Sequence, residues 1–182
     1  MTLEYLDAGP EAGPRWRRVA LALVLVVAIV AAGLFWWTGR VRAQATGVLE
    51  TAMANASRDA AAGEAVVLSM LQYTSPAIWS TSVGEDVRAG MRELVQGSAA
   101  EVVRTLDESR QEAESTFVLP WDSTERQAKD AVLAFVTAQR SRFEQIAVDA
   151  RALDDVLGQP GPTESAARAL LRASRASTAG GR

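Results

Sequence analysis

The stretch that decides the fold is Val19 to Trp37, VALALVLVVAIVAAGLFWW, nineteen consecutive residues without a charged or strongly polar side chain. As an α-helix rising about 1.5 Å per residue, it covers roughly 28 Å, close to the hydrocarbon thickness of a bilayer. A helix satisfies its own backbone hydrogen bonds in lipid. The segment therefore predicts a single membrane-spanning helix at 19–37, preceded by a short cytoplasmic tail at 1–18.

A cleavable signal peptide is the alternative interpretation of this N-terminus. Residues 43–45, Ala-Gln-Ala, resemble a small-x-small cleavage site. However, the apolar run exceeds the usual signal-peptide core of about 7–15 residues. Arg40 and Arg42 also lie immediately before the site, where charges are unusual. We therefore expect an uncleaved anchor.

The charges that flank the apolar segment favour a cytoplasmic N-terminus. Three arginines and the terminal amine precede the segment and two arginines follow it, and positive charge is enriched on the cytoplasmic side of membrane helices. We expect residues 43–182 to lie outside the cytoplasm, at the cell membrane. Tryptophan favours the membrane–water interface, which makes Trp16, Trp36 and Trp37 membrane-interface candidates.

The composition excludes several kinds of chemistry. The 182 residues contain no Cys and no His, which excludes disulfides, thiol catalysis, an imidazole base and the common zinc ligands. We expect no cofactor and no metal. From Ala43 to Gln159, eighteen acidic residues outnumber ten basic ones. A surface with this charge repels nucleic acid, so nucleic acid is not an expected partner.

Residues 38–159 predict three long helices separated by two breaks. The first continues without proline from the apolar segment and carries apolar or small residues at alternating spacings of four and three between Leu49 and Met70. Ser82 and Glu85 form a capping-box pattern for the second helix. The inward stripe of this second helix is expected to comprise Val87, Met91, Leu94, Val95, Val102, Leu106, Ala113 and Phe117.

A third helix is predicted after Pro120, with Asp122 and Glu125 as its capping box and Leu157 as its last apolar position. Gln139 lies within its apolar stripe, either as a buried amide that bonds across the bundle or as a ligand contact; we favour the first. Residues 160–182 are expected to form a short helix and a tail. The inward face of this short helix would comprise Ala166, Ala169, Leu170 and Ala173.

These lengths predict an all-α protein, with a single transmembrane helix followed by an antiparallel three- to four-helix bundle. In that topology the second turn returns to the bilayer surface. Its residues Phe117, Leu119 and Trp121 either insert among the headgroups or close the core. At the opposite turn, Ile78 and Trp79 either contact a partner protein or pack under the short C-terminal helix.

The sequence has no phosphate-binding loop, nucleophile elbow or converging set of carboxylates. We therefore expect a non-enzymatic, bitopic membrane protein whose acidic helical bundle serves as a protein-interaction or scaffold module, such as a subunit of an envelope assembly. Its expected partners are the lipid bilayer and either another protein or a second copy. The alternative is an extracytoplasmic sensory bundle that binds a ligand between its helices and signals through a partner.

Overall fold

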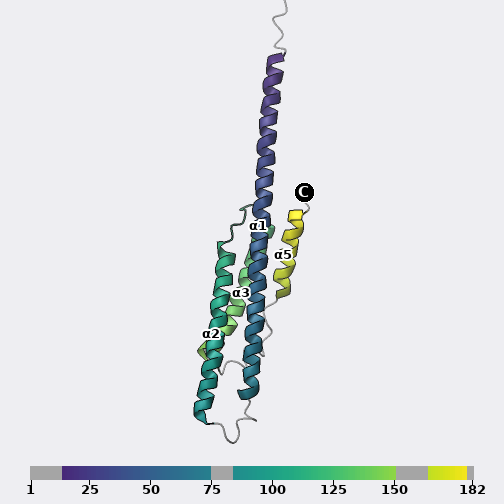
Figure 1. Cartoon of the computed structure of the whole chain (residues 1–182). Coiled ribbons are helices and arrows are strands. Elements are labelled where there is room, and N and C mark those ends of the chain that lie inside the picture. Colours follow the sequence, from purple (N-terminus) through teal and green to yellow (C-terminus); the bar gives the residue numbers. More distant parts are fainter. Residues whose placement is uncertain (1–13, 75–83, 151–163, 180–182) are drawn as a thin grey trace, which may run out of the picture. The chain divides into compact units, whose positions relative to one another are not determined.

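The computed structural model describes residues 14–74, 84–150 and 164–179, and within these ranges all regular secondary structure is helical. The helices are α1 (Pro14–Thr74), α2 (Glu85–Ser115), α3 (Ser123–Val148) and α5 (Glu164–Ala179) (Figure 1). The predicted all-α class is confirmed for the described residues. The chain divides into two compact units, Met1–Arg40 and Val41–Arg182, and α1 contributes to both.

The described part of the first unit is the N-terminal part of α1. Proline suits the first position of a helix because its fixed φ is helical and its missing N–H would have no partner there, and α1 begins at Pro14. The large apolar side chains between Val19 and Trp36 are 54–70% exposed, whereas a core helix of a soluble protein buries one face. The helix is long and apolar enough to cross a membrane.

The second unit has one continuous apolar core. The predicted seam of the first helix is confirmed from Leu49 to Val67, because its large members are buried and its small members allow close packing. The other three helices each add one buried stripe. The stripes are Val95, Ala99, Leu106 and Ala113 in α2, then Ala128, Val132, Phe135, Val136, Phe143 and Ile146 in α3, and Ala167 and Leu171 in α5.

Gly63 marks a close approach of α1 to its neighbours. A Cβ atom at this position would lie 2.5 Å from Val102 Cγ2 and 3.0 Å from Phe143 Cε1. Both distances are shorter than ordinary carbon–carbon contacts. Glycine therefore allows α1 to contact α2 and α3 at one point of the seam.

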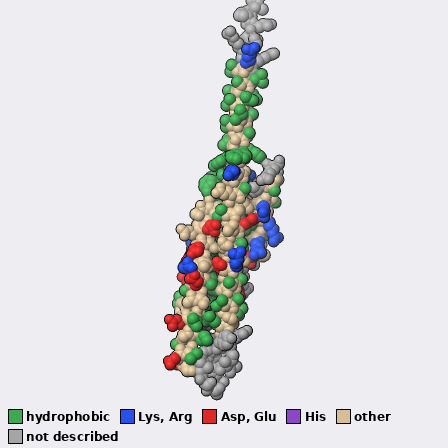
Figure 2. Space-filling model, viewed as in Figure 1, with side chains coloured by type: hydrophobic (Ala, Val, Ile, Leu, Met, Phe, Trp, Pro, Cys, Tyr) green, Lys and Arg blue, Asp and Glu red, His purple; other side chains and the backbone are tan. Residues whose placement is uncertain are grey.

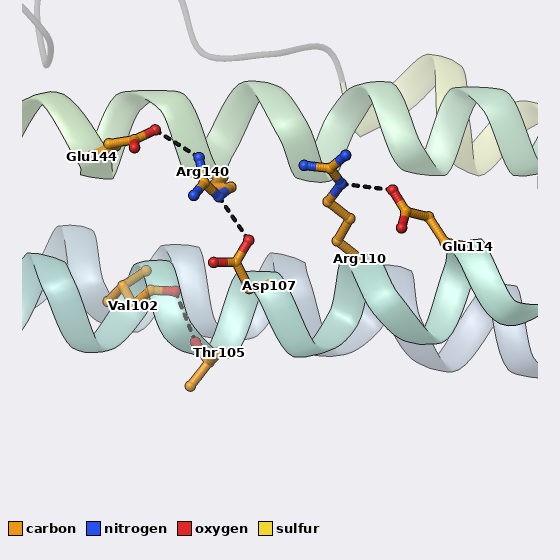
Figure 3. Close-up of polar contacts among 7 residues, drawn as sticks. All are labelled: Val102, Thr105, Asp107, Arg110, Glu114, Arg140 and Glu144. Carbon is orange, nitrogen blue, oxygen red and sulfur yellow. Dashed lines mark hydrogen bonds and ion pairs between the residues drawn. The ribbon is translucent and has the colours of Figure 1, made fainter.

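Helices α2 and α3 pack against each other and are joined by a short turn over residues 116–122. An ion pair also connects them on the surface: Arg140 Nε of α3 lies 2.7 Å from Asp107 Oδ1 of α2 (Figure 3). The same guanidinium reaches Glu144 one turn further along α3. Such exposed pairs add at most about 1 kcal/mol each, so the apolar core holds the two helices together.

Two expectations for α2 are wrong. Its N-cap is Gly84 in an extended conformation with no side-chain cap, and Ser82 lies outside the described residues. Part of the expected inward stripe is also exposed: Val87 is 51% and Leu94 56% exposed. Successive helical residues point about 100° apart, so Leu94 faces sideways when its neighbour Val95 enters the core. Phe117 lies beyond the end of the helix at Ser115.

The start of α3 is confirmed and its predicted end is wrong. Asp122 is the N-cap, and its carboxylate accepts a hydrogen bond from the Glu125 backbone N–H at 3.1 Å. The helix ends at Val148, where Asp149 takes an extended conformation. Valine and aspartate both have low helix propensity. The Gln96 side-chain amide of α2 also donates a hydrogen bond to the Val148 carbonyl at the end of the helix. Leu157 lies outside the described residues.

Among the described residues, Gln139 does not form the expected hydrogen bond to another helix. It is half-buried, and its side-chain oxygen accepts a 3.5 Å hydrogen bond from Arg142 on the same helix. The Arg142 guanidinium, carried by a long side chain, thus supplies the donor for the Gln139 amide oxygen.

The inward face of α5 differs by one residue from the predicted face. Ala167, Leu171 and Ser174 are buried, whereas Ala166, Ala169 and Ala173 are exposed. Leu170 is partly buried, as expected. The polar contacts to α1 fix this rotation, because Ser174 shares a 3.1 Å hydrogen bond with Thr46 and Glu164 accepts one from Ser57. An alanine-rich sequence does not distinguish these two rotations by apolar spacing.

Candidate functional site

The turn between α2 and α3 separates its apolar residues into two kinds. Leu119 is completely buried and is therefore a core residue, as in the alternative in which this turn closes the core. Phe117 and Trp121, on either side of it, are 60% and 65% exposed. One leucine thus closes the end of the core, and two aromatic side chains are left free in the same short turn.

A polar cluster, formed by the half-buried Arg42 and the buried Asp122 and Glu125, lies directly behind this turn. The Arg42 Nε and Asp122 Oδ2 atoms are 2.7 Å apart, which makes an ion pair although the N–H bond does not align as a hydrogen bond. The Asp122 backbone N–H donates to the Leu119 carbonyl at 3.0 Å. Asp122 therefore connects α1, the turn and the first residues of α3.

Glu125 is the unusual member of the cluster. Its side chain is 2% exposed, and neither of its carboxylate oxygens has a hydrogen-bond donor among the described residues. Burial raises the pKa of the Glu125 carboxyl, the negative charge of Asp122 raises it further, and Arg42 lowers it. Glu125 therefore completes only half of the predicted capping box, because its side chain does not return a hydrogen bond to the start of the helix.

A second region, which we call the acidic groove, runs between α1 and α2. It has a volume of about 690 Å³ and is open along one side. Its small and apolar lining is formed by Ala62, Gly63, Val66, Gly90, Leu94, Gly97 and Val102. Its polar lining is Asp59, Glu93, Ser98, Glu101 and Thr105. Val66 and Leu94 remain 40% and 56% exposed there, so apolar side chains face solvent within the groove.

The charge of the acidic groove has one sign. Three carboxylates and no Lys or Arg are found among the described residues that line it. Glu101 is paired with Arg104, on its own helix. On the surface as a whole, acidic side chains lie along α2, and basic side chains gather over α5 (Figure 2). The second unit therefore has an uneven charge distribution.

The remaining predicted site residues do not join either region. Trp16, Trp36 and Trp37 lie on the first unit, and each is substantially exposed. The Arg40 guanidinium lies 5.6 Å from the centre of the Trp36 ring, a cation–π geometry. Ile78 and Trp79, the predicted partner contacts, lie outside the described residues.

Sequence reasoning missed the acidic groove, although a signal for it was present. Val87, Gly90, Leu94, Gly97 and Glu101 recur at steps of three and four residues. They form a second stripe on α2, about a right angle from the buried one. Assigning Val87 and Leu94 to the core stripe hid this second face.

No protein-family model, curated protein or solved structure matches this chain. Among the described residues, no three acidic side chains lie close enough together to hold a metal ion. Two surfaces are therefore the basis for a functional proposal. One is the turn that exposes Phe117 and Trp121, which we call the aromatic turn, and the other is the acidic groove.

Proposed function

We propose that the chain is a single-pass membrane protein that presents its second unit outside the cytoplasm as a non-enzymatic protein-interaction module. In this proposal residues 19–37 span the bilayer, and α1 from residue 41 onward forms an antiparallel bundle with α2, α3 and α5. The main supporting observation is the combination of an unburied apolar segment with a well-packed helical unit that leaves apolar side chains exposed in a groove.

The aromatic turn supports a position close to the bilayer. Arg42 contacts Asp122 in this turn and follows Trp37 by five positions. Chain connectivity limits five residues to a span of at most about 18 Å. The exposed Phe117 and Trp121 are residue types that favour the headgroup region. We propose that these two side chains contact a membrane interface.

The shape of the acidic groove favours a protein partner over a small ligand. Small-molecule sites commonly enclose 70–90% of the ligand surface, whereas this groove is open along one side. Its volume is nevertheless in the range of ligand pockets, which keeps the sensory bundle as the second candidate. Exposed apolar side chains in a long, open channel are typical of surfaces that receive a helix.

The membrane assignment is tested by fractionation of the full-length chain. We expect the wild-type protein to resist extraction with alkaline carbonate. Val27→Arg combined with Val30→Arg should release it, because each arginine near the centre of a membrane helix costs about 2.5–3.5 kcal/mol. Val27→Leu combined with Val30→Leu is the matched control and should stay in the membrane. Release of the wild-type chain would contradict the proposal.

The orientation is tested by two reporters fused after Arg182, one active only in the cytoplasm and one active only outside it. We expect activity from the second reporter alone. The lipid contact is tested by quenching of tryptophan fluorescence with brominated lipids, with the Trp121→Phe variant used to isolate the contribution of Trp121. The proposed contact predicts that Trp121 is quenched; an unquenched Trp121 would exclude it.

A further inference from the structure

We infer that the acidic groove binds an amphipathic helix of another protein, one whose apolar stripe is flanked by arginine or lysine. This inference rests on the proposed function and gives the chemical class of the partner. Among the described residues, the interaction surface is formed by α1 and α2, so it is separate from the aromatic turn and its polar cluster.

The shape of the groove fits a helix. Its α2 side extends from Gly90 to Thr105, roughly 22 Å at 1.5 Å per residue, the length of about four helical turns. Its small residues keep the lining shallow: Gly90 and Gly97 have only open space where a side chain would begin. A helix with an apolar stripe could therefore approach closely and cover Leu94 and Val66, which are otherwise exposed.

The negative charge of the groove favours basic residues on either side of the apolar stripe of the bound helix. Asp59 on α1 and Glu93 on α2 line the groove, and neither forms an ion pair within the described ranges. Carboxylates on both helices would face the two sides of a bound helix. Complementary charges across an interface steer association and reject partners of like charge. Basic flanks fit this arrangement, and acidic flanks do not.

A second copy of the chain fits less well. Its only basic helix with an exposed small-residue face in the described ranges is α5, which carries Arg168, Arg172 and Arg175. That helix lies beside residues 46–57 of α1, as the Thr46–Ser174 and Ser57–Glu164 contacts place it. The α1 side of the groove begins only at Asp59. Two copies held side by side at the same level would not bring α5 to the groove, so we assign the groove to a different protein.

Site-specific photo-crosslinking in the native membrane tests the inference. The photoreactive residue p-benzoylphenylalanine replaces Gly97 in the full-length chain, where the surrounding space is open. Gly47, an exposed glycine of α1 that also has open space around it, is the matched control position outside the groove. We expect position 97 to crosslink to a segment that mass spectrometry identifies as an amphipathic, positively charged helix of another protein, and position 47 to give no such product.

Charge reversal then tests the reason for binding. Asp59→Arg and Glu93→Arg should each reduce the yield of that crosslink about tenfold. Asp130→Arg introduces the same charge change at an exposed position of α3 and should leave the yield unchanged. Thermal unfolding followed by circular dichroism confirms that each variant is folded before its crosslink is scored.

Several results would overturn the inference. These are no crosslink at position 97, a crosslink to a second copy, a crosslink to an acidic or non-helical segment, or a yield that charge reversal in the groove does not change. If the chain meanwhile stays in the carbonate-resistant membrane fraction, the proposed anchored function stands and only the partner class is wrong. Release of the wild-type chain from the membrane would instead contradict the proposed function itself.

Discussion

Arg42 and Asp122 are eighty positions apart in the sequence and form a 2.7 Å ion pair that connects α1 to the N-terminus of α3. The Asp122 side chain is 8% exposed, so solvent screens this pair less than the surface pairs of α2. Asp122 also caps α3 through its other carboxylate oxygen. One side chain therefore orients α1, α3 and the turn that precedes α3.

The two roles of Asp122 can be separated by substitution. Asp122→Asn keeps an acceptor for the Glu125 N–H and removes the charge, so it should lower the free energy of unfolding by about 1–2 kcal/mol. Asp122→Ala removes the cap as well and should cost about 1 kcal/mol more. Urea denaturation of the full-length chain in detergent measures both. Asp130→Asn, at an exposed position of α3, should change stability by less than about 0.5 kcal/mol. Equal losses for Asn and Ala would show that the cap contributes nothing.

The buried Glu125 carboxyl predicts a specific pH dependence. Its pKa in the folded state is raised above the ordinary value of 4.5, mainly by burial. The folded state therefore holds the proton more tightly than the unfolded state, and the Glu125 contribution to stability is highest below about pH 4.5 and falls as the pH rises through the folded pKa. Glu125→Gln removes this titration. The difference in unfolding free energy, variant minus wild type, should rise across that window in urea titrations at successive pH values. A difference independent of pH would contradict the prediction.

Substitution by alanine should have opposite effects on stability at Gly97 and at Gly63. Gly97→Ala adds a methyl group to open space and should stabilise the chain by about 0.5–1 kcal/mol, because alanine favours the helix. At Gly63 the same methyl would collide with Val102 and Phe143. Gly63→Ala should therefore destabilise the chain by about 1–3 kcal/mol, since overpacking outweighs the gain in helix propensity. Thermal melts of the two variants measure this contrast. A stabilising Gly63→Ala would show that α1 does not approach its neighbours so closely.

The aromatic turn should separate stability from membrane contact. Leu119→Ala should lower the free energy of unfolding by about 2–5 kcal/mol, because Leu119 is completely buried. Phe117→Ser and Trp121→Ser remove exposed side chains and should each change it by no more than about 0.5 kcal/mol. Urea denaturation in detergent measures all three. A large loss from either serine variant would place that aromatic side chain in the core instead.

The buried face of a helix could be predicted best where apolar or small residues recur at strict helical spacing. The seam from Leu49 to Val67 follows the helical repeat so closely that residue spacing alone identifies its buried face. The cap at Asp122 was equally clear, because a short acceptor side chain after a proline-containing turn is a strong start signal. The all-α class follows from these local patterns.

The rest depends on contacts that periodicity does not encode. On α2, apolar residues occupy two neighbouring faces, and only packing against α1 and α3 decides that Val95 enters the core while Leu94 borders the acidic groove. On α5, alanines surround the helix, and hydroxyl contacts at Ser174 select the rotation. The early end of α3 likewise reflects a side chain of α2, Gln96, which binds the last carbonyl.

The pairing of Thr46 with Ser174 across 128 positions has a consequence for biosynthesis. The segment that α5 covers emerges from the ribosome long before α5 itself has been translated. Until then the hydroxyl of Thr46 and the methyl groups near it have no permanent cover. A protein truncated before Glu164 would retain that unfinished surface for its lifetime, which makes it a natural target for chaperones and quality-control proteases.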